Sequence, residues 1–478
     1  FDKAVSLWNW YEKGINFNNE NIDGINLFEI LDTAEFHNLI IKEIYILLTM
    51  NRILDFKKPR KLYVNEHFGN ALKEKCIKEN IELCIIAGTK HEFITSWENP
   101  ILELKLSNLS ISLPISRSLI RKTKSTIDKF QDKFQKLSLE TNETRKILLF
   151  LEINPKTYET IFNNLDSNKK QIVILNRRRP IIDSDSLKII SKNKIKLINS
   201  NNFLDKNDKN LILKTQTKFL KNLNFVWSNN QKTLKKIFSI ENISFWILIT
   251  DVLFKIIKKR IHEYAELIIL SKKIHSTLNI NCIIHHNYVG ETEKVILNTK
   301  YEKSTSIMLQ HAYANYSSEF MRYDVFDTSH FKDKIALWGE KQKTNLLKHK
   351  EITSDKIILS GSPRHDIFFN SKSFQKKSNK KTVLITTQNF EWTNALLNTN
   401  QFINVESIFQ KIFDIFDDRP EIELKLKLHP ARDPYNEFLK DRIKKMNTKI
   451  QILQSESSKS VIEDCDLLVN IHSELIPS

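Results

Sequence analysis

Residues 146–175 read KILLFLEINPKTYETIFNNLDSNKKQIVIL, and this stretch decides the fold. Residues 146–153 form an apolar run typical of a strand buried on both faces, Pro155 opens a helical pattern, and residues 171–175 form a second apolar run. A third run follows at residues 194–198, after another helical pattern. Strands that alternate with helices in this way predict a parallel sheet covered by helices on both faces.

The same alternation extends in both directions along the chain. Residues 61–64 and 83–86 are upstream strand candidates that we expect in the same layered domain. Downstream candidates lie at residues 280–285, 306–310, 334–337, 356–359, 382–386, 423–428, 449–453 and 466–470. We therefore predict two α/β domains, residues 1–332 with a mainly helical insertion at about 203–276, and residues 333–478.

One helical stretch inside this insertion has two interpretations. Its apolar face carries Phe245, Ile247, Leu248 and Leu253, and the basic residues Lys258, Lys259 and Arg260 follow. Such a helix either faces the core and ends in a solvated basic turn, or lies flat on a membrane surface. We favour the core-facing interpretation.

The charge balance is strongly basic but does not indicate a nucleic-acid partner. Lys and Arg number 74 against 57 Asp and Glu, which gives a net charge of +17. The excess is spread along the whole chain as Lys, together with abundant Asn and Ile, and forms no single basic stripe. A phosphate-bearing substrate and an anionic membrane surface remain as possible partners of this charge.

The cysteines and the hydropathy of the chain indicate in which cellular compartment we expect the protein. The cysteines Cys76, Cys84, Cys282 and Cys465 form no CxxC pair, so we expect neither a zinc site nor disulfides, and a reducing cytoplasm fits best. The most apolar run, residues 245–257, is broken by polar residues, so we expect no transmembrane helix. Because the sequence begins at Phe1 and stops soon after an expected strand, we expect an incomplete C-terminal domain.

Two of the seven glycines mark a candidate site. Gly339 and Gly361 each follow an expected strand, and ligands of open α/β sheets bind at the carboxyl ends of strands. After the second glycine, Ser362 offers a hydroxyl and Arg364 a forked donor for phosphate. The alternative is a structural turn in which Arg364 pairs with Asp366.

Histidines end several of the expected strands. Gln310 and His311 end one strand, His285 and His286 end another, and His429 precedes Pro430 at the end of a third. A histidine at such a position can act as a base or contact a phosphate, whereas the alternative is a hydrogen-bonded structural role. We expect no metal site, because no carboxylate accompanies these histidines at ligand spacing.

Further polar residues lie near the expected strand ends of the second domain. Arg432 follows the His-Pro pair. Ser473 and Glu474 follow the last strand, where they either bind a phosphate and a ribose respectively or cap the next helix. The chain contains no P-loop, no GxGxxG fingerprint and no GxSxG elbow. These absences argue against kinases, P-loop NTPases, simple dehydrogenases and serine hydrolases.

Five segments in order resemble the landmarks of the GT-B glycosyltransferases that build surface polysaccharides. They are LQHAYANY (309–316), KIALWGEKQK (334–343), KIILSGSPRHDIF (356–368), LKLHP (426–430) and CDLLVNIHSE (465–474). The resemblance is to the CDP-glycerol glycerophosphotransferase and capsule polysaccharide group, and covers roughly residues 280–478. It implies two Rossmann-like domains that face a cleft, with the donor on the C-terminal domain.

The resemblance also implies roles for single residues. It makes His311 the candidate base in the cleft and His429 a contact of the donor phosphate, with Ser473, Ser362 and Arg364 on the donor side. Gly361, Arg432 and Glu474 join the donor-side set, and His285, His286, Gln310 and Gly339 the cleft. The sequence departs from the family at Ala312, where a glycine is expected, and at residues 470–473, which replace the usual Asp-Tyr-Ser-Ser-like ending.

The sequence thus predicts a metal-independent transferase without a cofactor. It would move a sugar or polyol-phosphate group from a CDP-, CMP- or UDP-linked donor to a glycan or lipid-linked acceptor. We expect a cytoplasmic protein that docks peripherally at the inner membrane face. Two alternatives stay open: an enzyme similar to UDP-N-acetylglucosamine 2-epimerase, and a non-catalytic scaffold of glycan assembly.

Overall fold

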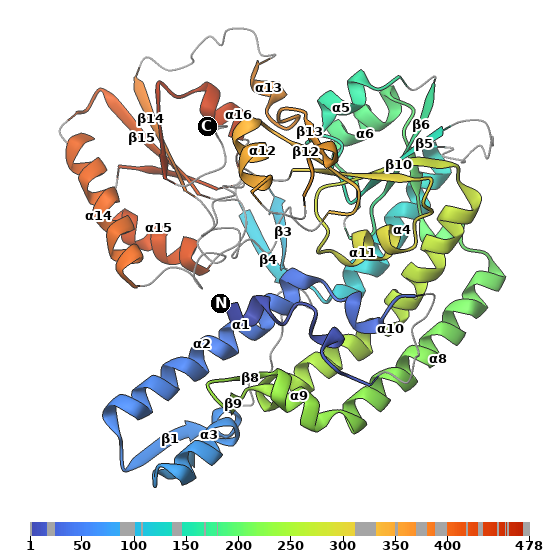
Figure 1. Ribbon diagram of the computed structural model, residues 1–478. Helices are drawn as coiled ribbons and strands as arrows, with labels where there is room; N and C mark the ends of the chain where they lie inside the picture. Colours follow the sequence, from blue (N-terminus) through green and yellow to red (C-terminus); the bar gives the residue numbers. More distant parts are fainter. Residues whose placement is uncertain are drawn as a thin grey trace. The chain divides into compact units, whose positions relative to one another are not determined.

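The structure is a computed structural model in which the chain forms two compact units. It describes all residues except 1, 17–23, 87–100, 107–108, 136–145, 167–168, 179, 311–330, 349–351, 370–379, 388–398, 417–418, 429–433, 447–448, 455, 457 and 472–478. Of the described residues, those up to 363 form the first unit and those from 364 onward form the second (Figure 1). Each unit contains its own parallel sheet.

The first unit contains a seven-stranded parallel sheet. Its strands are β5 (Lys146–Leu151), β6 (Lys170–Leu175), β7 (Lys196–Ile198), β10 (Ile280–His285), β11 (Thr305–Leu309), β12 (Lys334–Leu337) and β13 (Ile357–Leu359). Their spatial order is β13-β12-β11-β10-β5-β6-β7, and all neighbours run parallel. The chain thus winds from β5 to one edge, returns to β10 beside β5, and winds to the other edge. This is the doubly wound order of Rossmann-like folds.

Alternate residues of the central strand explain why this sheet is covered on both faces. Ile147, Leu149 and Leu151 pack into the larger core together with helices α8 (Lys206–Asn229), α10 (Trp246–Thr277) and α11 (Glu291–Asn298). Leu148 and Phe150 pack on the opposite face with α5 (Glu159–Asn164) and α6 (Ser184–Lys192). Such a strand has no solvent face, which accounts for its continuous apolar sequence.

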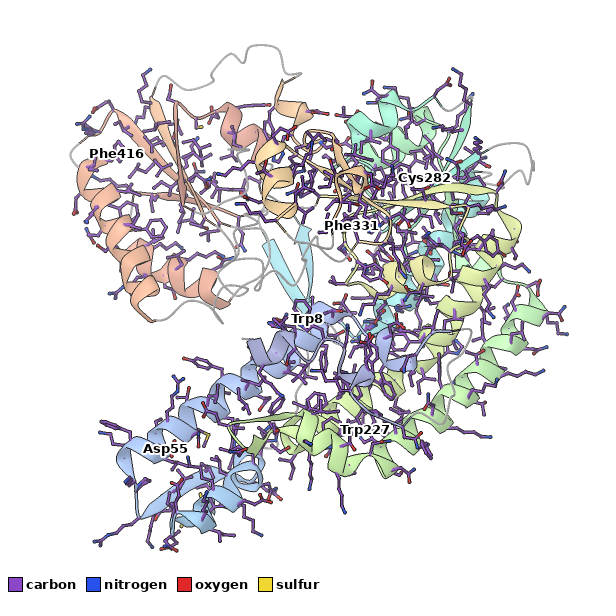
Figure 2. The ribbon with its side chains drawn as sticks, in the orientation of Figure 1. Trp8, Asp55, Trp227, Cys282, Phe331 and Phe416 are labelled. Carbon is purple, nitrogen blue, oxygen red and sulfur yellow. The ribbon has the colours of Figure 1, made fainter. Side chains whose placement is uncertain are left out.

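A helical layer occupies the predicted insertion. Besides α8 and α10 it contains α7 (Ser200–Phe203), α9 (Gln231–Ile237) and the short strands β8 (Ser239–Ile240) and β9 (Ile243–Ser244). Figure 2 places Trp227 in this layer, where its ring packs against Trp246 and Phe254. The core-facing part of the favoured interpretation of α10 is confirmed, since Leu248 and Leu253 are buried, although Ile247 is exposed. The prediction of a solvated basic end was wrong, because α10 continues to Thr277 and Arg260 is buried within it. No helix among the described residues is long and apolar enough to cross a membrane.

The N-terminal segments form small structures outside the large sheet. They comprise α1 (Asp2–Val5), α2 (Thr33–Lys57), β1 (Lys61–Asn65), α3 (Glu66–Lys78), β2 (Glu82–Ile86), the hairpin β3 (Ile101–Leu106) and β4 (Leu109–Pro114), and α4 (Arg117–Gln135). β1 and β2 pair only with each other among the described strands. Both strands were predicted, but they form a separate two-stranded sheet and do not extend the layered one as we expected.

The second unit contains a four-stranded parallel sheet. Its strands are β14 (Lys381–Thr387), β15 (Ile422–Lys427), β16 (Gln451–Leu453) and β17 (Leu467–Ile471), in the order β16-β15-β14-β17. Its helices are α13 (Asp366–Phe369), α14 (Thr399–Phe416), α15 (Pro434–Met446) and α16 (Ser458–Glu463). Here too the chain winds outward from β14 and returns to pair β17 with β14. The predicted class of two Rossmann-like α/β domains is confirmed.

The boundary between the units differs from the predicted one. β12 pairs with β11 and β13 pairs with β12, so both strands belong to the first sheet. The helix between them is α12 (Glu340–Leu346). The structure therefore divides the chain after residue 363 and not after residue 332. Strand periodicity alone does not say which sheet a strand joins, which explains the difference.

Candidate functional site

The first candidate site is the carboxyl edge of the seven-stranded sheet, where β5 and β10 lie side by side. This is the switch point, at which consecutive strands wind away in opposite directions, and ligands of open α/β sheets bind at such points. Glu152 follows β5, Arg177 and Arg178 follow β6, and Asn287 follows β10. Charged side chains from two strand ends and an amide from a third therefore lie at this edge.

Glu152 connects these strand ends. Its carboxylate accepts hydrogen bonds from the backbone N–H groups of Arg177 at 2.9 Å and Arg178 at 3.1 Å, and from the Thr292 hydroxyl at 2.8 Å. Its own backbone has φ 51°, in the left-handed region that residues other than glycine rarely adopt. A carboxylate with three donors in this position holds the loop after β6 against the start of α11.

Arg178 and Glu293 form an ion pair beside Gly290, the residue that precedes α11. A side-chain Cβ at Gly290 would overlap both the Arg178 guanidinium and the Glu293 carboxylate. Burial raises the pKa of Glu293 to about 7, and Arg178 acts in the opposite direction. The glycine at this position therefore leaves the room that the ion pair occupies.

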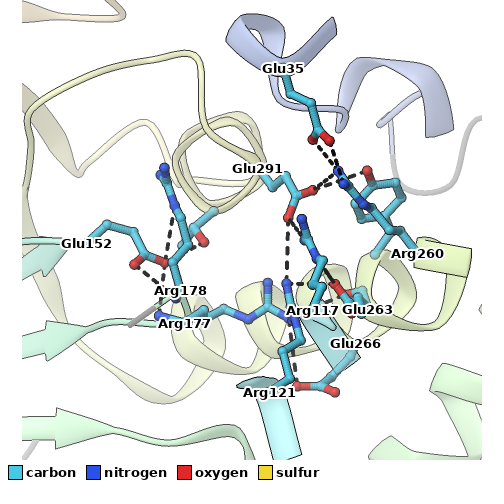
Figure 3. A network of polar contacts seen from close by, with 12 residues as sticks. Glu35, Arg117, Arg121, Glu152, Arg177, Arg178, Arg260, Glu263, Glu266 and Glu291 are labelled. Carbon is cyan, nitrogen blue, oxygen red and sulfur yellow. Dashed lines mark hydrogen bonds and ion pairs between the residues drawn. The ribbon is translucent and has the colours of Figure 1, made fainter. Parts of the chain in front are cut away.

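A larger network of buried charges continues from this edge into the helical layer (Figure 3). Arg260 of α10 is 1% exposed and contacts Glu291 of α11 at 3.2 Å. The Tyr264 hydroxyl donates to the same carboxylate at 3.2 Å, and Arg117 of α4 contacts it at 2.7 Å. Burial opposes ionisation of Glu291, but Arg117 and Arg260 outweigh it and hold its pKa well below the ordinary value.

Glu263 of α10 contacts three arginines of the network. Its carboxylate lies 3.0 Å from Arg117 and 2.7 Å from Arg121, and its backbone carbonyl accepts from Arg177 at 3.3 Å. Every arginine labelled in Figure 3 has at least one glutamate in contact. Since the charges are paired, the network positions α4, α10 and α11 around the switch point and leaves little charge for a ligand.

His285 lies inside the first unit. Its side chain is 0% exposed, and Nδ1 lies 2.7 Å from the carbonyl oxygen of Asn287, so this nitrogen carries the proton. Burial lowers the pKa of His285 to about 4, which keeps the ring neutral near pH 7. Its Nε2 has no hydrogen-bond partner in the part of the chain that the structure describes. His286 is partly buried. Their predicted place in a cleft stays a prediction.

Gln310 and Gly339 meet at the start of α12. The Trp338 N–H donates to Gln310 Oε1 at 3.2 Å and to Gln342 Oε1 at 3.0 Å, and the Gly339 N–H donates to the latter at 3.1 Å. Gly339 has an extended backbone that any residue adopts, and nothing lies within 4 Å of an added Cβ. The backbone at this position therefore does not require glycine.

The backbone at position 361, in contrast, favours glycine. Its φ is 69°, in the left-handed region, and it lies two residues beyond the end of β13. Ser362 and Arg364 follow it and are partly buried, in the segment where the chain passes from the first unit to the second. The phosphate contacts of Ser362 and Arg364 stay a prediction.

The remaining predicted residues lie outside the described residues. They are His311, His429, Arg432, Ser473 and Glu474. Within the described part of the chain, no three His, Cys, Asp or Glu side chains gather in a way that could hold a metal ion. The catalytic and donor-binding roles of the five residues therefore stay predictions.

The second candidate site is the carboxyl edge of the four-stranded sheet, where β14 and β17 form the switch point. Thr386 Oγ1 of β14 donates to Asn470 Oδ1 of β17 at 3.0 Å. On the other side of β14, Lys427 pairs in register with Thr386. The Lys427 side chain is buried although it carries an ammonium group. These polar residues form one level of the sheet at its carboxyl edge, where ligands of open α/β sheets bind.

Lys427 was not among the residues predicted from the sequence. Residues 422–427 read IELKLK, in which charged and apolar residues alternate. Such alternation is typical of a half-buried strand with one solvent face, so it predicts exposed lysines. In the structure Lys427 is buried, and a buried lysine needs a partner or a ligand.

Some solved structures resemble this chain in fold at low sequence identity. No protein-family model and no curated protein matches the chain. Solved structures similar to it include UDP-GlcNAc 2-epimerase from Methanocaldococcus jannaschii, at 11% identity and TM-score 0.36, which covers 68% of this chain and 78% of that chain. The wall teichoic acid polymerase TagF matches at 9% identity and TM-score 0.33, over 75% of this chain and 72% of that chain. The N-terminal domain of trehalose-6-phosphate phosphatase from Candida albicans matches at 11% identity and TM-score 0.35, over 67% of this chain and 77% of that chain.

Proposed function

We propose that this protein is a transferase of the two-domain glycosyltransferase type. It moves a sugar or polyol-phosphate group from a nucleotide-activated donor to a hydroxyl of a growing surface glycan. The observation that supports this most is the presence of two separate doubly wound sheets, each with its own switch point. Nucleotides bind at such points, and a reaction between two substrates can use one edge for each. In this proposal the four-stranded sheet takes the donor.

The proposed chemistry uses histidines at strand ends. The acceptor hydroxyl oxygen bonds to the transferred carbon or phosphorus, the bond from that atom to the nucleotide's phosphate oxygen breaks, and His311 takes the hydroxyl proton. His429, Arg432 and Ser473 neutralise the departing nucleotide phosphate. No metal or cofactor is needed in this scheme.

Other predicted residues complete the donor site in this proposal. Arg364, which opens the second unit, contacts the donor phosphate, and Glu474 binds its ribose. The net charge of +17 supports docking at an anionic inner membrane face, where a lipid-linked acceptor would be available.

A thermal-shift screen of the whole chain against CMP, CDP, UDP, GDP and ADP tests the proposal. A ligand that binds only the folded protein at about one hundred times its Kd stabilises it by about 2.7 kcal/mol, so one nucleotide should raise the melting temperature by several degrees. The shift should be lost in His429→Ala. His262→Ala is the matched control, because His262 is exposed on α10 and contacts Gln216 at 3.1 Å.

Other outcomes favour the alternatives. Stabilisation by no nucleotide in a chain that melts cooperatively would contradict the proposal and favour a scaffold protein. Stabilisation by UDP, together with conversion of a UDP-sugar in the absence of any acceptor, would favour an epimerase. Equal shifts in wild type and His429→Ala would overturn the role of that histidine.

A further inference from the structure

Lys427 carries a buried charge at the end of β15. Its side chain is 3% exposed, and Nζ donates to the carbonyl oxygens of Leu428 at 3.2 Å and Gln454 at 2.6 Å. No carboxylate of the described residues lies within ion-pair distance of it. Burial lowers the pKa of Lys427, and the negative charge of Glu456 acts in the opposite direction. Two carbonyl dipoles are thus the hydrogen-bond partners of this ammonium.

The neighbouring Lys425 differs from Lys427 because carboxylates pair with its charge. Lys425 lies two residues earlier on the same strand and face, and its Nζ lies 2.7 Å from Asp464 and 3.5 Å from Glu423. The charge of Lys425 is therefore paired, whereas no carboxylate among the described residues pairs with that of Lys427. An ammonium has three N–H donors, and the described residues accept two of those of Lys427, so one donor is left for another partner.

The position of Lys427 fits a ligand better than a purely structural role. It pairs in register with Thr386 of β14 on one side and with Leu453 of β16 on the other. It therefore lies in a central strand at the carboxyl edge, one strand away from the switch point between β14 and β17. Anionic ligands of doubly wound sheets bind at this edge.

We propose that the ammonium of Lys427 is the counter-charge of a phosphate-bearing ligand at the carboxyl edge of the four-stranded sheet. Its third N–H donates to a phosphate oxygen, and the anion neutralises the buried positive charge. The inference rests on the proposed function for the origin of this phosphate, which would belong to the nucleotide-activated donor. The ammonium itself recognises the phosphate and not the base.

Isothermal titration of the whole chain with inorganic pyrophosphate tests this directly. Lys427→Met keeps the length of the side chain and removes the charge, so we expect pyrophosphate binding to weaken by about tenfold or more, as for loss of a charge-assisted hydrogen bond. Lys425→Met is the matched control and should change the affinity by less than about threefold. Wild type that melts cooperatively and binds no pyrophosphate, or Lys427→Met that binds like wild type, would overturn the proposal.

A second variant does not depend on whether Lys427→Met folds. Glu456 is exposed, and its carboxylate accepts from the Gln454 N–H at 2.7 Å. Glu456→Gln keeps an acceptor there and removes the acidic charge that acts on Lys427. At a pH low enough to keep Lys427 protonated in both proteins, pyrophosphate should then bind about two to five times more tightly, because a repulsive charge near the anion is gone. Unchanged or weaker binding would contradict the proposal.

The same titrations separate this inference from the proposed function. Pyrophosphate binding that depends on Lys427, in a protein that binds no nucleotide, would support the site and contradict the transferase. Nucleotide binding that survives Lys427→Met without loss of affinity would support the transferase and overturn the role of Lys427.

Discussion

Arg260 and Glu35 form a buried ion pair with two parallel hydrogen bonds. Nη2 lies 2.7 Å from Oε1 and Nη1 lies 2.5 Å from Oε2. The two residues are 225 positions apart in the sequence, and both side chains are 3% exposed or less. The pair therefore joins α2 to α10 in the interior of the first unit.

Removal of one partner of this pair should destabilise the protein. Arg260→Met removes a positive charge that contacts the buried carboxylates of Glu35 and Glu291. Breaking a buried ion pair costs about 3–5 kcal/mol. We expect a clearly lower melting temperature by calorimetry. Lys259→Met is the control, because Lys259 is exposed on the same helix, and should melt close to wild type. Equal melting temperatures for the two variants would contradict this role.

Two glycines offer a matched test of the space that the site requires. Gly290→Ala places a methyl group where Arg178 and Glu293 lie, and we expect a loss of about 1–3 kcal/mol because the ion pair must shift. Gly339→Ala adds a methyl group with nothing within 4 Å and should change stability by less than about 0.5 kcal/mol. Urea unfolding of both variants measures the difference. A larger loss at Gly339 would show that the account of these glycines is wrong.

Stability should fall in mild acid because of His285. Burial lowers its pKa in the folded protein to about 4, while the unfolded imidazole keeps its ordinary value of 6.5. The stabilisation is therefore complete above about pH 6.5 and is lost as the pH falls toward 4, where the unfolded state binds the proton first. For this pKa difference the loss is up to about 3 kcal/mol.

The variant His285→Asn isolates this contribution. His37 also has a pKa lowered to about 4 by burial, so the wild-type profile contains more than one histidine. The free energy of unfolding of the variant should change less between pH 6.5 and 4 than that of wild type, whatever its absolute stability. His262→Asn, which changes an exposed histidine, should keep the wild-type slope. Parallel profiles for all three proteins would count against the assignment.

The sequence predicted the strands well because burial on both faces leaves a local pattern. β5, β6 and β10 appear close to their predicted positions. Strand pairing is not local, so β12 was assigned to the wrong sheet and β1 was expected in a sheet that it does not join. Elements with weaker patterns, such as the hairpin of β3 and β4, were not predicted.

The candidate sites were predicted in part for the same reason. Gly361 stands out because the chain has only seven glycines, and a left-handed turn needs one. By contrast, nothing near Glu35 indicates that it pairs with a residue 225 positions away. Lys427 was missed because the alternation of lysine with leucine in β15 is typical of a half-buried strand, whereas the structure buries this side chain.

In the proposed function, a nucleotide-activated donor binds the carboxyl edge of the four-stranded sheet. Hydrogen–deuterium exchange of the whole chain, with and without the nucleotide that stabilises it, tests this most directly. We predict slower exchange at the carboxyl ends of β14, β15 and β17, around Thr387, Leu428 and Ile471, and little change in α8. Protection confined to the seven-stranded sheet, or none at saturating nucleotide, would contradict the account.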